Sequence, residues 1–117
     1  MFDGIFVKGL PMKEIVYNKL VRDRIPAIIR ADGKACETEV LDDDAFLAAL
    51  DKKMTEELRE YEESHSAEEL ADLLEVIYAA ADVLGYGREQ LEALRIRKAE
   101  KRGGFRQKIF LKTVREP

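Results

Sequence analysis

The sequence lacks the features of disulfide-linked proteins, membrane-spanning proteins and proteins with phosphate-binding loops. Among its 117 residues there is one cysteine, Cys36, so an internal disulfide is excluded and a cytoplasmic protein is expected. No run approaches the roughly 18 apolar residues that a membrane-spanning helix needs. The first residues lack a basic start and a small-residue cleavage site, so we expect no signal peptide. No glycine-rich phosphate loop or dinucleotide fingerprint occurs.

The composition, 46% hydrophobic and 38% charged, is typical of a globular protein rich in amphipathic helix. The chain has no repeat and no Pro/Gly-rich linker, so we expect one domain, over residues 17–117. We expect residues 1–16 to be a poorly specified lead-in to it. A chain this short buries only about two-thirds of its unfolded surface, which favours self-association. The net charge of −4 argues against a general nucleic-acid binder, and we expect neither a nucleic-acid nor a membrane partner.

Capping residues predict an all-α fold with an antiparallel helical hairpin at its centre. The expected helices cover residues 26–32, 42–63, 66–85 and 88–102. Pro26 suits a first helical turn, Asp42, Asp43 and Asp44 are candidate N-caps, and Ser66 with Glu69 fits a capping box. A break at Ser64–His65 separates the two longest helices. The β-forming segments 36–41 and 108–114 predict short strands that pair as a minor two-stranded ribbon.

Two pairs of acids, each spaced i, i+3, lie on the covered faces of the hairpin helices. At about 100° per residue, Glu69 and Asp72 share an arc with Val76, Ala80 and Val83, at the rim of the core. The predicted apolar arc of that helix is made of Leu70, Leu73, Leu74, Ile77 and Leu84. In the preceding helix, Glu57 lies inside the apolar arc of Leu47, Leu50, Met54, Leu58 and Tyr61, and Glu60 lies beside it. Since an unpaired buried charge is very costly, these acids need a partner.

The register of an antiparallel hairpin brings the four acids together. Glu57 and Asp72 are equidistant from the Ser64–His65 break, and so are Glu60 and Glu69, so the carboxylates stack in two layers. Divalent cations relieve the repulsion in such a cluster, and oxygen ligands favour Mg²⁺, Mn²⁺ or Ca²⁺ over zinc. The sequence therefore predicts a metal site at these residues.

Simpler roles for the same acids stay open. Glu69 can serve only as the back-bonding residue of its capping box, Glu57 can pair with Lys53 one turn earlier, and Glu60 can solvate the rim. Either acidic pair alone is common in charged helices. The shared arc and the mirrored register together favour a single site.

Two groups of basic residues are candidates for binding phosphate. Lys98 and Arg102 are one helical turn apart, just before Gly103-Gly104, where backbone N–H groups can approach an anion. Lys19 and Arg22 lie in the N-terminal segment NKLVRDR. The alternative is that these residues are helix-end cations and surface solvation.

Three segments resemble one enzyme family. EELRE (56–60) followed by EELADLLEVI (68–77) resembles the EExxE…ExxD signature of the MazG-like, all-α NTP pyrophosphohydrolase superfamily. YNKLVRDRIP (17–26) and KAEKRGGF (98–105) resemble the flanks of a compact subgroup labelled phosphoribosyl-ATP pyrophosphohydrolase-like. The resemblance runs from about Tyr17 to Val114. It implies a four-helix-type bundle that associates as dimers or tetramers.

The resemblance also implies a site and a reaction. Mg²⁺, or Mn²⁺, would be held by Glu57, Glu60, Glu69 and Asp72, with Glu56 as a further motif acid. A nucleoside triphosphate would be hydrolysed to the monophosphate and pyrophosphate, as in cleansing of the nucleotide pool. From the site itself, we expect an acid that is not fully engaged with metal, Glu57 or Glu60, to accept the proton of the attacking water. The outer phosphates would be held by Lys19, Arg22, Lys98 and Arg102.

Two other functions stay open on the sequence. One is hydrolysis of phosphoribosyl-ATP in histidine biosynthesis, although the other segments of that enzyme are not found in this chain. The other is a non-catalytic helical module for dimerisation or nucleotide sensing, in which the acids only solvate a seam.

Overall fold

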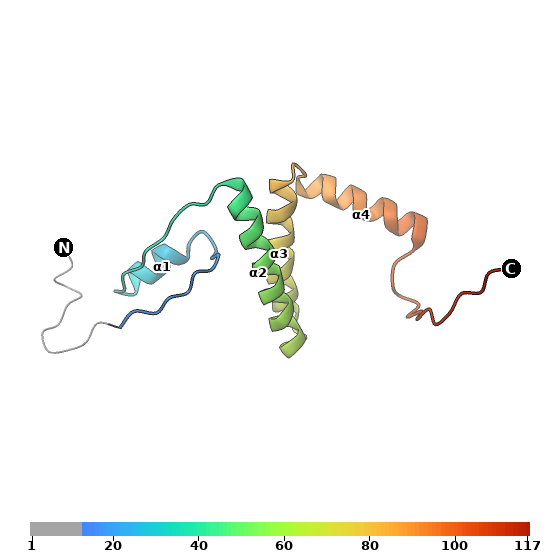
Figure 1. The fold of residues 1–117 in the computed structure, drawn as a ribbon, viewed down its shortest axis with the longest axis horizontal. Helices are drawn as coiled ribbons and strands as arrows, with labels where there is room; N and C mark the ends of the chain where they lie inside the picture. The colour runs from blue at the N-terminus through green and yellow to red at the C-terminus, as the bar shows by residue number, and fades with distance from the viewer. Residues whose placement is uncertain (1–12) are drawn as a thin grey trace, which may run out of the picture. The chain divides into compact units, whose positions relative to one another are not determined.

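The computed structural model describes residues 13–117, and within them it contains four helices and no strand (Figure 1). The helices are α1 (Ile25–Ala31), α2 (Asp43–Ser64), α3 (Ala67–Val83) and α4 (Arg88–Arg102). The all-α fold class is therefore confirmed. Most of the predicted lead-in, residues 1–12, lies outside the described residues. The chain forms two compact units, which divide between Ala80 and Ala81.

The predicted caps and the predicted break set the ends of the hairpin helices. The Asp42 side chain accepts a hydrogen bond from the Ala45 N–H at 2.9 Å and starts α2. That helix ends where His65 takes a left-handed conformation, with φ of 51°, and donates its N–H to the Tyr61 carbonyl. Ser66 Oγ then accepts a hydrogen bond from the Glu69 N–H at 3.3 Å and starts α3. The two-residue break, His65 and Ser66, thus reverses the chain, as the sequence predicts.

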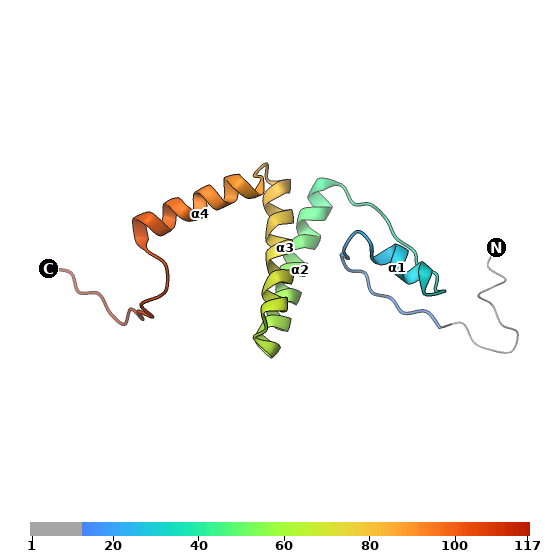
Figure 2. The same ribbon diagram turned by 180° about the vertical axis from the view of Figure 1, so that it is seen from behind.

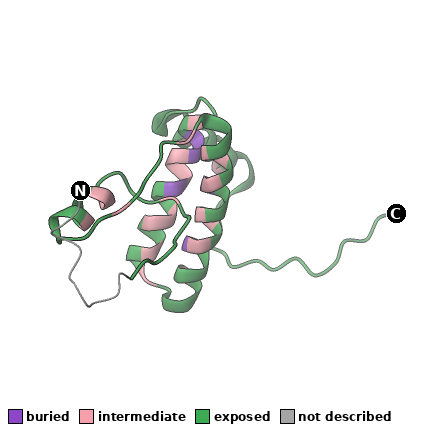
Figure 3. Ribbon diagram, turned by 60° about the vertical axis from the view of Figure 1, so that its left-hand side comes forward, coloured by how far each residue is buried: buried purple, intermediate pink, exposed green. Residues whose placement is uncertain are grey.

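Helices α2 and α3 lie side by side and antiparallel in opposite views of the ribbon (Figures 1 and 2). The buried positions lie on these two helices (Figure 3). The buried apolar side chains are Leu50, Val76, Ala80 and Ala81. Glu57 is buried as well, with 7% of its surface exposed. The described chain therefore has a small apolar core with a carboxylate inside it.

One prediction about the hairpin is only partly right, because the predicted apolar arc of α3 is half-buried at Leu73 and Ile77 and exposed elsewhere. Leu70 and Leu74 are 48% and 44% exposed, whereas Val76 and Ala80 are buried. Val76 and Ala80 belong to the arc that also carries Glu69 and Asp72. Because Glu69 and Asp72 lie beside Glu57 of α2, this arc faces α2. Glu69 and Asp72 are themselves half-buried, so they lie at the edge of the interface with α2.

The two predicted strands, and the ribbon they would form, are absent from residues 13–117. Val40 is 100% exposed, and Ile109 and Phe110 are 79% and 86% exposed. Residues of this kind form stable strands when neighbouring strands and a covering surface bury them. Neither segment has such a cover within its own unit, so composition alone is a misleading signal here.

The second unit contains the end of α3 and the whole of α4. The Gly87 N–H donates a hydrogen bond to the Gln90 side chain at 2.7 Å and starts α4. The helix stops at Gly103, whose φ of 86° is readily adopted by glycine. In the described part of the chain, no helix combines the length and the apolarity needed to cross a membrane.

Candidate metal centre

The candidate centre lies where α2 and α3 face each other. Glu57 comes from α2, and Glu69 and Asp72 come from α3. One carboxylate oxygen from each residue lies within 4.8 Å of the other two. Glu57 is buried and the two α3 acids are half-buried. The structure therefore brings together three of the four predicted ligands, across the break that the mirrored register indicates.

Glu60, the fourth predicted ligand, lies outside this three-oxygen group. Its side chain is exposed, one helical turn beyond Glu57. It still acts on Glu57, because the nearby Glu60 carboxylate adds to the effect of burial in raising the pKa of Glu57. Direct ligation by Glu60 stays a prediction.

Two oxygens of the cluster have no hydrogen-bond partner, namely Oε2 of Glu57 and Oε2 of Glu69. An unsatisfied buried polar atom costs about 1–3 kcal/mol, and more when it carries charge. Burial is the main cause that raises the pKa of Glu57, Glu60 adds to it, and Lys53 opposes it. The cluster therefore lacks compensation for its full negative charge.

Lys53 supplies part of that compensation from within α2. Its Nζ lies 3.4 Å from Oε1 of Glu57 and 3.2 Å from Oε2 of Glu56. The ion pair between Lys53 and Glu57, which the sequence left as an alternative to a metal site, is confirmed. It does not exclude that site, because it occupies Oε1 and leaves Oε2 without a partner.

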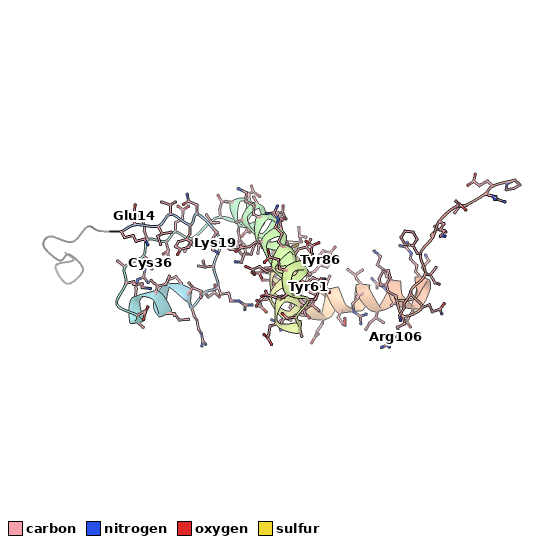
Figure 4. All side chains as sticks on the ribbon, turned by 90° about the horizontal axis from the view of Figure 1, so that it is seen from below. Glu14, Lys19, Cys36, Tyr61, Tyr86 and Arg106 are labelled. Atoms are coloured by element: carbon pink, nitrogen blue, oxygen red, sulfur yellow. The ribbon has the colours of Figure 1, made fainter. Side chains whose placement is uncertain are left out.

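The N-terminal segment contributes two more cations. Lys19 Nζ lies 3.0 Å from Oε1 of Glu56, and Arg22 Nη2 lies 2.7 Å from Oδ1 of Asp72. Figure 4 labels Lys19 on this segment. Hydrogen bonding to Lys19, and then to Lys53, lowers the pKa of Glu56. Both predicted phosphate ligands of this segment therefore lie at the acids.

The other predicted phosphate ligands, Lys98 and Arg102, are exposed near the end of α4 in the second unit. They remain one helical turn apart, as predicted. The contacts described above are all made by residues of the first unit.

The contacts of Arg22 with Asp72 and of Lys19 with Glu56 were not predicted from the sequence. The partners are 50 and 37 residues apart, so no local spacing signals either pair. Lys53, in contrast, precedes Glu56 and Glu57 by three and four residues. That spacing is visible in the sequence.

The three acids fit a magnesium ion. Mg²⁺ takes oxygen ligands at about 2.1 Å, so two oxygens on one ion lie within about 4.2 Å of each other. The three carboxylate oxygens lie within 4.8 Å of one another, so a small side-chain rotation is enough to bring them to this separation. The group contains no thiolate and no imidazole, which disfavours zinc. The unpartnered oxygens of Glu57 and Glu69 are available as ligands.

The buried charge of Glu57 leads to a stability prediction. Replacing it in Glu57→Gln should raise the free energy of unfolding of the metal-free protein by about 1 kcal/mol at pH 8. The folded state holds the Glu57 proton more tightly than the unfolded chain, whose carboxyl has its ordinary pKa of 4.5. Wild-type stability therefore falls as pH rises from that value through the raised pKa, and the gain from glutamine should be absent at lower pH.

Urea unfolding followed by circular dichroism at several pH values measures this difference. Glu62→Gln is the matched control, because it removes an exposed carboxylate from the same helix. Equal stability of Glu57→Gln and wild type at pH 8 would show that the buried charge carries no penalty.

Comparison with known proteins gives limited similarity. No family model matches the chain, and no solved structure matches it. A Mycolicibacterium smegmatis protein described as uncharacterized is 52% identical over 42 residues. The match covers 36% of this chain and 43% of that protein, less than half of the relative's length.

Proposed function

We propose that this protein is a Mg²⁺-dependent nucleoside triphosphate pyrophosphohydrolase of the MazG-like, all-α type. The observation that carries the proposal is the convergence of three carboxylates in a helix interface, with two of their oxygens lacking a partner. The same three residues belong to the EExxE…ExxD resemblance. Sequence pattern and side-chain geometry therefore support one site, and cleansing of the nucleotide pool is the role that we propose for it.

The acids would act in two ways on a bound nucleotide. Glu57, Glu69 and Asp72 would hold the cation, which when bound neutralises charge on phosphate oxygens and lowers the pKa of water. Glu60 is exposed beside Glu57 and lies outside the three-oxygen group, so it is the better placed acid to accept a proton. Water would bond to the α-phosphorus, its proton would pass to Glu60, and pyrophosphate would leave.

Basic residues would bind the outer phosphates. The contact of Arg22 with Asp72 uses Nη2, and a guanidinium has five N–H donors, so donors remain for a phosphate. The Arg22 and Lys19 side chains are 57% and 44% exposed, which leaves them accessible. Phosphate binding by Lys98 and Arg102, which are exposed on α4, stays a prediction from the sequence.

We also propose that the protein acts as a homodimer or homotetramer. Three leucines of the hairpin, Leu58, Leu70 and Leu74, are 44–48% exposed, whereas few apolar side chains are buried. A two-helix hairpin buries little surface alone, and pairing two hairpins gives a four-helix bundle with a larger core.

The single cysteine is in keeping with a reducing, cytoplasmic setting.

The proposed association can be tested by light scattering. Wild type should have at least twice the mass of one chain, and Leu74→Glu should shift the protein toward the monomer, because it places a charge on the exposed leucine face. Glu75→Gln, next to it in the sequence, is the control. A wild-type monomer at micromolar concentration would contradict this part of the proposal.

The proposed chemistry can be tested with a panel of canonical and modified nucleoside triphosphates, scored for pyrophosphate release with Mg²⁺. Asp72→Asn and Glu60→Gln should lower kcat by about 100-fold or more, since one loses a cation ligand and the other a base. Glu68→Gln, an exposed acid of α3, should keep wild-type activity.

Full activity in Asp72→Asn and Glu60→Gln would contradict the site. Growth of a histidine auxotroph carrying this chain would instead indicate phosphoribosyl-ATP as substrate. A Mg²⁺-dependent thermal shift without turnover would indicate a nucleotide-sensing module.

A further inference from the structure

Lys53 lies in the middle of a chain of ion pairs that runs from the N-terminal segment to the acid cluster. Lys19 contacts Oε1 of Glu56, and Oε2 of Glu56 contacts Lys53. Lys53 then contacts Oε1 of Glu57. The Lys53 side chain is only 16% exposed, whereas that of Lys19 is 44% exposed. The contact of Lys53 with Glu57, which lies nearest the cluster, is therefore better protected from water than the contact of Lys19 with Glu56.

The two glutamates in this series of ion pairs differ in how many of their carboxylate oxygens contact a lysine. Both oxygens of Glu56 contact a lysine. In Glu57 only Oε1 does so, and Oε2 is buried without a partner. The terminal torsion of a free glutamate rotates over a broad range, so fixing one oxygen also fixes where the other points.

We propose that Lys53 is a positioning residue for the metal centre, holding Oε1 of Glu57 so that Oε2 is presented to the cation with Glu69 and Asp72. Glu56, held by Lys19, fixes Lys53 in turn. The proposal rests on the function of the cluster as a metal site. Lys53 touches neither cation nor substrate in this role, and acts through Glu57.

A purely electrostatic role for Lys53 predicts the opposite result. If Lys53 only adds positive charge near the cluster, its removal makes the site more negative, and a cation should bind more tightly. If Lys53 positions Glu57, its removal frees the carboxylate to rotate, and the cation should bind less tightly. The sign of the change therefore separates the two roles.

The test is the affinity of the full chain for Mg²⁺, measured by isothermal titration calorimetry, and for Mn²⁺, measured by electron paramagnetic resonance. Lys53→Met, which keeps the aliphatic stem, should weaken binding of both ions about tenfold, as expected for loss of a residue that orients a metal ligand. Lys52→Met is the matched control, since it removes the same charge from the neighbouring, exposed position. Lys53→Arg, which restores the charge and a donor, should recover most of the affinity.

The outcomes separate failure of the positioning role from failure of the metal site itself. Unchanged or tighter binding by Lys53→Met, with clear binding by wild type, would overturn the positioning role and leave the metal site standing. Absence of saturable binding by wild type would overturn both. If Lys53→Met does not fold, as judged by circular dichroism, Lys53→Gln replaces it, and the same weakening relative to Lys52→Met is expected.

Discussion

The burial of the Glu57 carboxylate between two helices is the constraint on which the rest of the structure depends. Residues 43–83 contain 13 acidic and three basic side chains. Repulsion among these negative charges favours acids that point outward into water. The hairpin nevertheless gathers Glu57, Glu69 and Asp72 in the interface. Lys53 pairs with Glu57 and Arg22 pairs with Asp72, whereas Oε2 of Glu57 and Oε2 of Glu69 have no partner. A bound cation is the compensation that we propose for them.

The same constraint accounts for the packing of the hairpin. Val76 and Ala80 are buried on the face of α3 that carries Glu69 and Asp72, whereas Leu70 and Leu74 remain 48% and 44% exposed. The exposed leucines are then available to a second copy, which connects the proposed oligomer to the proposed site.

Local signals predicted most of the architecture. The caps at Asp42 and Ser66 set the helix starts, and the break between them set the register that places Glu57 near Asp72. The position of Lys53 relative to Glu57 was also visible as one helical turn. Hydrophobic periodicity did not reveal which of two apolar arcs of α3 faces α2, because an exposed leucine arc and a buried one have the same pattern. The contact between Arg22 and Asp72 joins segments that are distant in the sequence, so no local spacing predicts it.

Anomalous diffraction from crystals of the full chain grown with Mn²⁺ tests the central claim most directly. The account predicts an anomalous peak bonded to carboxylate oxygens of Glu57, Glu69 and Asp72, at about 2.2 Å from each, as expected for a hard divalent cation with oxygen ligands. Crystals that hold Mn²⁺ elsewhere on the protein, with no peak between α2 and α3, would contradict it.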